Sequence, residues 1–184
     1  MRYMDTSFYT EEELGAVGFK HYGRAVLVSR RASIYHPEEI ELGDNVRIDD
    51  FCVLSGAIKI GNNVHISAGV YMYGKYGIEI GDYSGCSAGC KIYSETDDFS
   101  GEYMIGAVLP KELTNVIHGR VVMKKYSQLG ANTVVMPGVT IEEGAVTGAM
   151  TFVKCSLEPW TINVGVPARK LKNRSRSMLG MIAS

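Results

Sequence analysis

The chain lacks any apolar run near the roughly 18 residues that a membrane-spanning helix needs. It also lacks a charge excess, because 19 Lys and Arg residues face 20 Asp and Glu residues, for a formal net charge of −1. Nothing in this balance indicates a nucleic-acid partner. The first residues, MRYMDTSFYTEEE, are polar and acidic and do not resemble a secretory signal peptide. We therefore expect one globular domain of 184 residues without a membrane span.

Cysteine and histidine are too few and too scattered to suggest a metal centre. The chain has four cysteines, and the only close pair, Cys86 and Cys90, has the spacing CxxxC. Zinc clusters use CxxC-type pairs or nearby histidines. We predict no metal site and interpret the four cysteines as reduced core thiols of a cytoplasmic protein. The four are Cys52, Cys86, Cys90 and Cys155.

Aliphatic residues recur at every sixth position over most of the chain. Thirteen of fifteen positions in this register are Ile, Leu, Val or Met, with a slip of two residues between Met72 and Ile80. A helix would need a period near 3.6 residues, which this lane does not have. The positions are Leu42, Ile48, Leu54, Ile60, Ile66, Met72, Ile80, Cys86, Ile92, Met123, Leu129, Val135, Ile141, Thr147 and Val153.

A second, mostly apolar lane lies two residues before the first and begins with Ile40, Val46 and Cys52. Two inward residues spaced by two indicate a short strand. The residues between strands, such as GDN, GNN and GDY, suit tight corners. Strands this short bury their lanes by stacking coil on coil, so the pattern predicts an all-β solenoid. An ordinary β-sandwich is disfavoured because its strands alternate over longer runs between variable loops.

The repeat resembles that of the left-handed β-helix, or hexapeptide-repeat, acyltransferases. The segments LGDNVR, IDDFCV, IGNNVH, ISAGVY, IGDYSG and LGANTV fit the family's six-residue pattern, and the likeness covers about residues 28–172. The resemblance implies a left-handed parallel β-helix that assembles as a homotrimer. It also implies acetyl-CoA as acyl donor and a sugar or nucleotide-linked sugar as acceptor, in the branch that serves surface polysaccharides. Whether a hydroxyl or an amine is acylated stays open.

Three segments lie outside the regular register. Residues 1–25 precede the β-helix of residues 26–160, and the sequence from Thr10 to Glu13 fits a capping box that opens a short helix. Residues 93–120 break the register, and such an interruption of a repeat is typical of a functional loop. Residues 161–184 form a capping segment in which ARKLKNRSRSMLGMIA predicts a basic helix, with Trp160 packed beneath it.

The resemblance marks the residues that would bind the donor. QLGAN matches the family segment beside the thioester oxygen and indicates Gly130 and the backbone N–H of Ala131. TGAMTFVK matches the segment that holds the pantetheine arm. GVPARK matches the terminal element near the adenine and the 3′-phosphate. From these two segments we expect donor contacts from Ala149, Lys154, Gly165, Pro167, Arg169 and Lys170.

The general base is not decided by the resemblance, because Asp97 stands where many family members have a loop histidine. The candidates are Asp97 or Asp98, His65, which follows inward Val64 and so points outward, and His118 at the far end of the loop. An acceptor amine that needs no strong base is a further alternative. SETDDFSGEY resembles the corresponding loop of sugar O-acetyltransferases.

The long loop is also the expected acceptor site, with Glu102, Tyr103 and Asn115 as contacts. Two other functions compete on the same scaffold. A zinc enzyme similar to the γ-class carbonic anhydrases needs three histidines on adjacent coils, and only His65 lies within the regular coils. A non-catalytic solenoid for assembly or binding would favour flat arrays without a long loop. The loop and the GVPA segment favour the enzyme.

Overall fold

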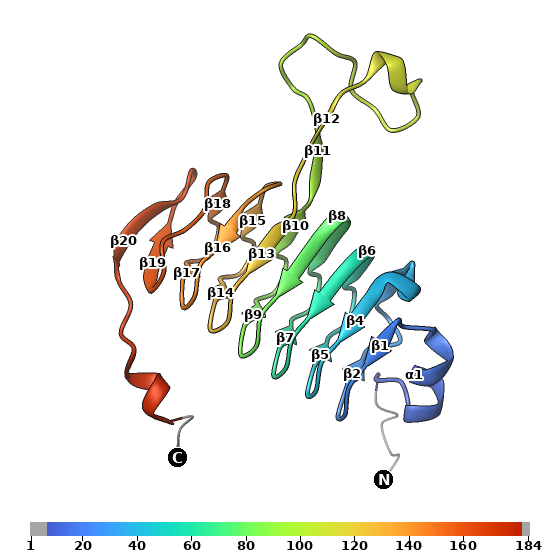
Figure 1. Ribbon diagram of the computed structural model, residues 1–184, viewed down its shortest axis with the longest axis vertical. Coiled ribbons are helices and arrows are strands. Elements are labelled where there is room, and N and C mark those ends of the chain that lie inside the picture. The colour runs from blue at the N-terminus through green and yellow to red at the C-terminus, as the bar shows by residue number, and fades with distance from the viewer. Residues whose placement is uncertain (1–6, 182–184) are drawn as a thin grey trace.

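Short parallel strands wind into a three-sided, left-handed coil whose successive turns stack along one axis (Figure 1). The computed structural model describes residues 7–181, so the outermost residues of the predicted terminal segments, 1–6 and 182–184, lie outside the described residues. The predicted all-β solenoid is confirmed. Within the described residues, no helix has the length and apolar character needed to cross a membrane.

The three sides of the coil are here named faces A, B and C. Face A contains β1 (His21–Tyr22), β4 (Ile40–Leu42), the second halves of β6 (Val53–Ile60) and β8 (Tyr71–Ile80), β13 (Val121–Met123) and β16 (Thr140–Ile141). Face B contains β2 (Leu27–Val28), β5 (Arg47–Ile48), β7 (His65–Ile66), β9 (Gly85–Cys86), β14 (Gln128–Leu129), β17 (Val146–Thr147) and β19 (Thr161–Val164). Face C contains β3 (Ser33–Tyr35), the first halves of β6 and β8, β10 (Lys91–Tyr93), β15 (Val134–Val135) and β18 (Phe152–Val153).

Both predicted apolar lanes point into the coil. All fifteen residues of the first lane are buried, and so is the second lane from Ile40 to Thr151. Burying a large aliphatic side chain contributes about 1.5–3 kcal/mol, so the stacked lanes are the main source of stability. The expected core thiols are buried at Cys52, Cys86 and Cys90, but the prediction is wrong for Cys155, which is exposed. Burial raises the pKa of Cys52 and of Cys90 to about 11.

The corners turn through residues in the left-handed region of backbone space. At corner A/B, between faces A and B, Asn45 and Asn63 have φ of 55° and 56°, and the Asn45 side-chain amide donates to Asn63 at 2.8 Å. Tyr83 and Tyr126 take the same conformation further along, and their rings stack with centroids 5.6 Å apart. Corner B/C comprises residues 49–52, 67–70, 87–90, 130–133 and 148–151, and corner C/A comprises residues 36–39, 56–57, 74–77, 94–120 and 136–139.

The two-residue slip between Met72 and Ile80 is a bulge at corner C/A. Strand β8 pairs with β6 up to Gly56 opposite Gly74, and the pairing resumes with Ile58 opposite Ile78. One residue of β6 therefore faces three residues of β8, Lys75 to Gly77. A side chain at Gly74 would lie 2.8 Å from the Ile58 side chain, so the bulge needs glycine there. The extra residues carry Lys75 and Tyr76 outward from this corner.

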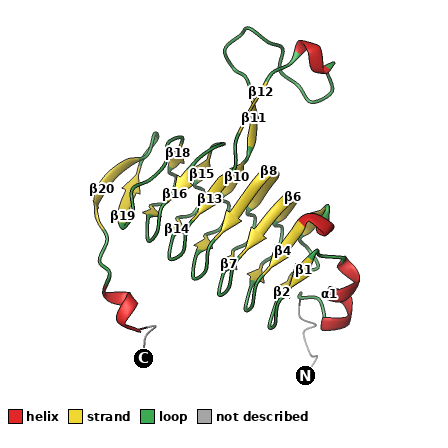
Figure 2. Cartoon of the chain, in the orientation of Figure 1, coloured by secondary structure: helices red, strands yellow, loops and turns green. Residues whose placement is uncertain are grey.

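The two ends of the coil are covered differently. At the N-terminal end the predicted helix is confirmed as α1 (Glu11–Val17), with a complete capping box between Thr10 and Glu13 and with Leu14 buried. At the other end, up to Met181, the chain forms β20 (Arg169–Asn173) and the 3₁₀ turn η3 (Ser177–Met181) in place of the expected helix (Figure 2). Strand β20 pairs antiparallel with β19, because the last coil offers an open sheet edge whose backbone groups need partners.

Arg174 fastens this C-terminal segment to the coil. Its guanidinium donates to the carbonyls of Tyr126 at 2.7 Å and Gly144 at 3.0 Å, and it lies over the buried ring of Trp160. Burial lowers the pKa of the Arg174 guanidinium. The predicted packing of Trp160 under the tail is thereby confirmed.

Replacing Arg174 with Ala should lower the free energy of unfolding by about 1–3 kcal/mol, because two carbonyls lose their donor. Arg176→Ala is the matched control, since Arg176 is exposed and also lies over Trp160. We expect the control to change stability by less than about 0.5 kcal/mol in urea denaturation. An equal loss in both variants would show that contact with Trp160, and not the two hydrogen bonds, holds the segment.

Candidate active site

The interruption after β10 is a projecting arm, residues 94–120, that leaves the coil at corner C/A (Figures 1 and 2). Its stem is an antiparallel ribbon of β11 (Glu95–Asp97) and β12 (Val116–His118), in which Asp97 faces Val116 and Glu95 faces His118. The tip holds the short 3₁₀ turn η2 (Lys111–Leu113). A third 3₁₀ turn, η1 (Pro37–Glu39), lies at the same corner three coils earlier.

The two adjacent aspartates of the arm have different surroundings. Asp98 accepts from the Asn115 side chain at 2.9 Å and from the Ser100 backbone N–H at 2.8 Å, and these bonds hold its pKa below the usual value. In the described part of the chain, no hydrogen bond or ion pair engages the Asp97 carboxylate. Asp98 therefore closes the arm, which here means that it holds the two sides of the arm together through Asn115 and Ser100. The Asp97 carboxylate is available to a ligand.

Asp97 lines a pocket of about 440 Å³ between the stem and the tip of the arm. Lys75 and Lys111 bring two cations to this pocket, and Lys75 pairs with Glu95 at 3.0 Å. Part of the pocket wall is made of small or apolar residues, namely Gly106, Ala107, Leu109 and Val116. A free carboxylate beside two cations on a partly apolar wall suits an acceptor that carries both an anionic group and a nucleophile.

The three expected acceptor residues do not line this pocket. Glu102 and Tyr103 are exposed in the tip, and Asn115 is committed to Asp98. His118 stacks on Tyr76 at the base of the arm, with ring centroids 4.0 Å apart. The backbone N–H of Tyr76 in turn donates to the buried Ser94 at 3.0 Å. His118 is exposed, contacts Tyr76 at the base of the arm and does not line the pocket that holds Asp97.

His65 points outward on face B, as predicted. Its Nε2 lies 2.7 Å from the Asp49 carboxylate, which also accepts from Arg47 Nε at 2.7 Å. Partial burial opposes ionisation of Asp49, but the hydrogen bonds from Arg47 and His65 outweigh it and lower its pKa. The pair stands on a different face of the coil from the arm, so a single chain does not bring His65 and Asp97 to one corner.

Corner B/C carries the residues expected to hold the donor. Ala131 and Ala149 lie one above the other on successive coils, and the Ala131 carbonyl accepts from Met150 N–H at 2.8 Å. In the described residues, no hydrogen bond uses the backbone N–H of Ala131 or of Ala149. A side chain at Gly130 would lie 2.5 Å from the Gly148 carbonyl carbon, so this wall stays narrow. Free N–H groups on a narrow wall suit a thioester oxygen and an extended amide chain.

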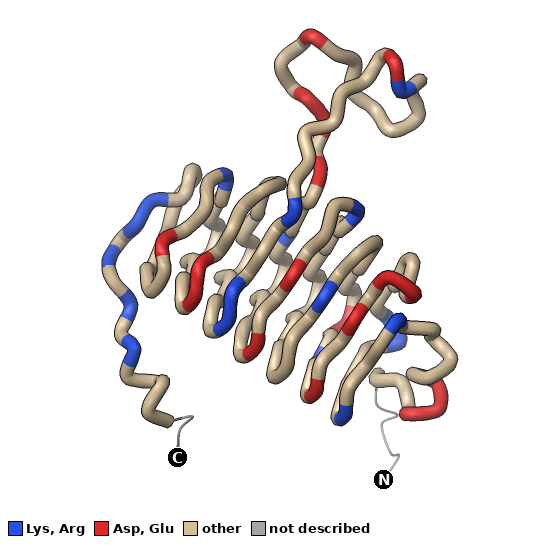
Figure 3. The backbone as a smooth tube through the Cα atoms, viewed as in Figure 1, with Lys and Arg blue, Asp and Glu red and all other residues tan. Residues whose placement is uncertain are grey.

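The C-terminal element adds cations at the end of the coil, beyond β18. A pocket of about 200 Å³ is lined by Lys154, Pro167, Arg169 and Lys170, and its cations could accept a phosphate-bearing group. Gly165, with a φ of 99°, precedes this turn. Lys170 is paired with Glu158 at 2.9 Å. Figure 3 shows that basic residues continue along β20.

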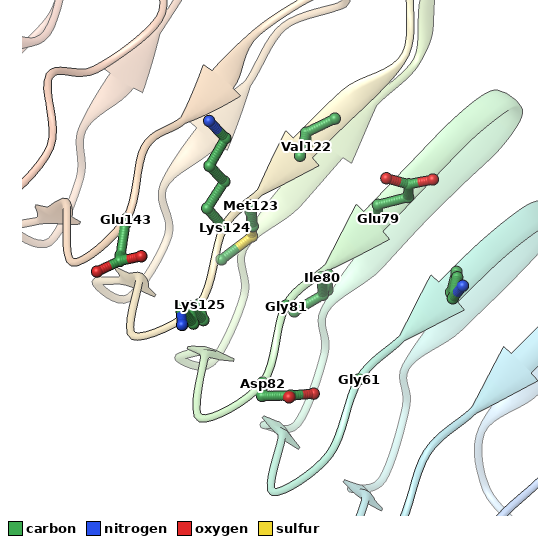
Figure 4. A pocket seen from close by; sticks show the side chains of 11 residues that line it. Gly61, Glu79, Ile80, Gly81, Asp82, Val122, Met123, Lys124, Lys125 and Glu143 are labelled. Atoms are coloured by element: carbon green, nitrogen blue, oxygen red, sulfur yellow. The ribbon is translucent and has the colours of Figure 1, made fainter.

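Ala131 and Ala149, expected beside the thioester and the pantetheine arm, therefore lie at corner B/C, whereas Asp97 lies on the arm at corner C/A. Strand β10 of face C runs from corner B/C to corner C/A, where the arm begins. A further pocket of about 450 Å³ lies on face A (Figure 4). Its lining includes Lys124, Lys125 and Glu143 but none of the residues predicted for catalysis or binding.

Comparisons with known proteins match this architecture. The family model "Bacterial transferase hexapeptide (six repeats)" matches residues 39–74. The dTDP-4-amino-4,6-dideoxy-D-glucose acyltransferase of Escherichia coli is 40% identical over 182 residues, which is 97% of this chain and 92% of that protein. The chain belongs to the hexapeptide-repeat acyltransferases.

Among solved structures, this acyltransferase is similar to several of one relative, AntD. A variant of the N-acyltransferase AntD from Bacillus cereus, in complex with dTDP-4-amino-4,6-dideoxyglucose and coenzyme A, is 44% identical, with a TM-score of 0.95 over 97% of this chain and 96% of that one. AntD in complex with dTDP and 3-hydroxybutyryl-CoA is 45% identical, again with a TM-score of 0.95, over 97% and 95% of the two chains. The predicted acyltransferase is thereby confirmed, and the alternative of a non-catalytic solenoid is excluded.

Several residues of this acyltransferase's arm pocket escaped prediction from the sequence. Lys75 lies in the β8 bulge, and Tyr93 and Glu95 flank the start of the arm. The two-residue slip was the available signal, because it marks the coil that departs from the regular register at the same corner as the arm.

Asp98→Ala should loosen the arm, because the Asn115 amide and the Ser100 N–H lose their acceptor. We expect amide hydrogens of β11 and β12 to exchange about tenfold faster, as the loss of roughly one to two hydrogen bonds implies. Hydrogen–deuterium exchange at neutral pH measures this. Glu102→Ala is the control, since its side chain is exposed and engages no described residue. Unchanged exchange in Asp98→Ala would contradict the closing role.

Proposed function

We propose that this acyltransferase moves an acyl group from an acyl-CoA to the amino group of a nucleoside-diphosphate-linked aminosugar. The observation that carries the proposal is the near full-length likeness to two enzymes named for, or bound to, dTDP-4-amino-4,6-dideoxyglucose. The arm pocket fits such an acceptor, because it offers cations for a diphosphate and a free carboxylate for an amine. This favours an amine over a hydroxyl as the acylated group.

Asp97 is the residue we assign to the amine. Structures of AntD were determined for substitutions of one serine and of one aspartate that lie ten residues apart in its sequence. In this chain only Ser87 and Asp97 have that identity and spacing. Ser87 lies at corner B/C, where its N–H donates to the Leu129 carbonyl at 2.9 Å. One residue of the matched pair, Asp97, thus lies on the arm, and the other, Ser87, lies at the corner that carries the proposed donor residues.

We also propose that three copies of the chain share these sites as a homotrimer. Ser87, Ala131 and Ala149 lie at corner B/C, whereas Asp97 lies beyond face C on the arm. One chain holds the two groups apart, so a common site needs the arm of one copy to meet corner B/C of another. Closed cyclic symmetry repeats such a heterologous contact without leaving one unpaired.

We also propose that the enzyme is cytoplasmic. This proposal rests on the reduced cysteines and on both proposed substrates being cytoplasmic metabolites.

The proposed step follows from these groups. The amine nitrogen attacks the thioester carbonyl carbon, and the Ala131 N–H stabilises the developing oxyanion. As the C–S bond breaks, the nitrogen becomes an amide and the released proton ends on the coenzyme A sulfur. Asp97 accepts a hydrogen bond from the amine, which aims its lone pair and relays the proton. His65, held by Asp49 on face B, has no part in this step.

The first test supplies dTDP-4-amino-4,6-dideoxyglucose with acetyl-CoA or 3-hydroxybutyryl-CoA. We expect thiol release that depends on the acceptor, and a product heavier by one acyl group. The matched control is dTDP-6-deoxyglucose, which has a hydroxyl in place of the amine and should release no thiol. Equal release with the control would replace the N-acylation proposal with O-acylation, and no release with any nucleotide-linked aminosugar would remove the acceptor class.

The second test combines two variants. Asp97→Asn and Ala149→Trp should each lower turnover at least about tenfold, the first by weakening proton transfer and the second by filling the donor groove. Co-expressed chains that assemble randomly should recover about a quarter of native turnover, because a site can take its arm and its corner from different copies. Asp98→Asn should stay within about threefold of native turnover, since Asp98 only closes the arm. Mixtures no better than the single variants would place the whole site within one chain.

A further inference from the structure

A fourth pocket, of about 290 Å³, opens where face C meets corner C/A, beside the arm. Its floor is made of the small residues Ser55, Gly56 and Gly74, and Tyr73 forms one wall. His36 and Glu39, around the turn η1, line the pocket as well. The arm pocket and this pocket share two lining residues, Lys75 and Glu95, so the two cavities meet at that ion pair.

The wall residue Tyr73 belongs to a column of outward side chains at the last position of face C. Backbone pairing places Tyr35, Ser55, Tyr73 and Tyr93 in one register on four consecutive coils. The rings of Tyr73 and Tyr93 are stacked, with centroids 5.5 Å apart and planes within 7°. The other ring face of Tyr73 looks along the axis toward Ser55, whose short side chain leaves the next place in the column empty of an aromatic ring.

Neighbouring strands are roughly 4.8 Å apart, which is close to the separation of stacked planar rings. A flat ring above Ser55 would therefore continue the stack of Tyr93 and Tyr73. Tyr73 is 39% exposed, so this face is open to a ligand. The polar groups of Glu39 and His36 at the edge suit the N–H and carbonyl groups of a nucleobase better than they suit an aliphatic chain.

We infer that the slot formed by Tyr73, Ser55, Gly56 and Gly74 binds the nucleobase of the acceptor. The base stacks on Tyr73, the diphosphate crosses Lys75, and the aminosugar reaches Asp97 in the arm pocket. This inference rests on the proposed nucleotide-linked acceptor and adds the residue that recognises its base. The β8 bulge places Lys75 at the point where the two pockets meet, so an acceptor bound in both pockets would pass Lys75 between its base and its aminosugar.

Calorimetric titration of the full-length protein with dTDP tests the slot. Tyr73→Ala should weaken dTDP binding at least tenfold, in keeping with the usual strength of base stacking on an aromatic side chain. Tyr73→Phe keeps the ring and should stay within twofold of native affinity. Tyr83→Ala, which removes a comparable stacked tyrosine at corner A/B, should also stay within twofold. Coenzyme A affinity should be native in all three variants.

The outcomes separate the slot from the proposed function. Native dTDP affinity in Tyr73→Ala overturns the slot and leaves the nucleotide-linked acceptor standing. Absence of dTDP binding in the native protein, with coenzyme A still bound, overturns both. Loss of coenzyme A binding along with dTDP in Tyr73→Ala would assign Tyr73 to the fold or to the donor, and it would also overturn the slot.

Photocrosslinking gives a readout that needs no variant. Irradiation of the native protein with 5-iodo-2′-deoxyuridine diphosphate should label Tyr73 within the tryptic peptide of residues 60–75. Excess dTDP should remove the label, as expected for a specific site. Competed labelling confined to other peptides would place the base elsewhere.

Discussion

Backbone hydrogen bonds between successive coils are the interaction on which the rest of this molecule depends. Most strands have two or three residues and cannot persist alone, so each exists only through its neighbours along the axis. The ladder continues even across the arm, because the N–H of Gly81 donates to the Met123 carbonyl at 2.7 Å. The coil before the arm therefore bonds directly to the coil after it. A long segment can leave corner C/A without weakening the axis.

This construction gives different mechanical support to the proposed donor corner and to the arm. The proposed donor residues Ala131 and Ala149 lie on stacked corners whose neighbours are fixed by ladder bonds above and below. Asp97 lies on a ribbon of three residue pairs that is closed by Asp98, Asn115 and Ser100. The proposed donor wall is therefore the better supported of the two, and the arm, with fewer ladder bonds, is the part that can open locally.

The six-residue register predicted the coil because inward residues repeat wherever a strand repeats, and every lane residue is indeed buried. The individual roles of Asp97 and Asp98 could not be predicted, since they depend on Asn115 and Ser100 across the arm. The C-terminal prediction failed for a related reason. Arg, Lys and Leu favour a helix locally, but unpaired groups of β19 recruit residues 169–173 into a strand. In each of these cases, contacts with residues distant in the sequence determined the local structure.

Strand β20 has a consequence for how the enzyme stays discrete. A solenoid built from parallel strands presents at its end the same edge that each of its own coils uses, so a second molecule could continue the series. β20 runs antiparallel to β19 and is exposed along its whole length with Arg169, Lys170 and Lys172. A second molecule that docked at this end would meet the backbone donors and acceptors of an antiparallel strand, and the positive charges of β20 would repel those of its own. The reversed last strand thus guards against end-to-end fibre growth.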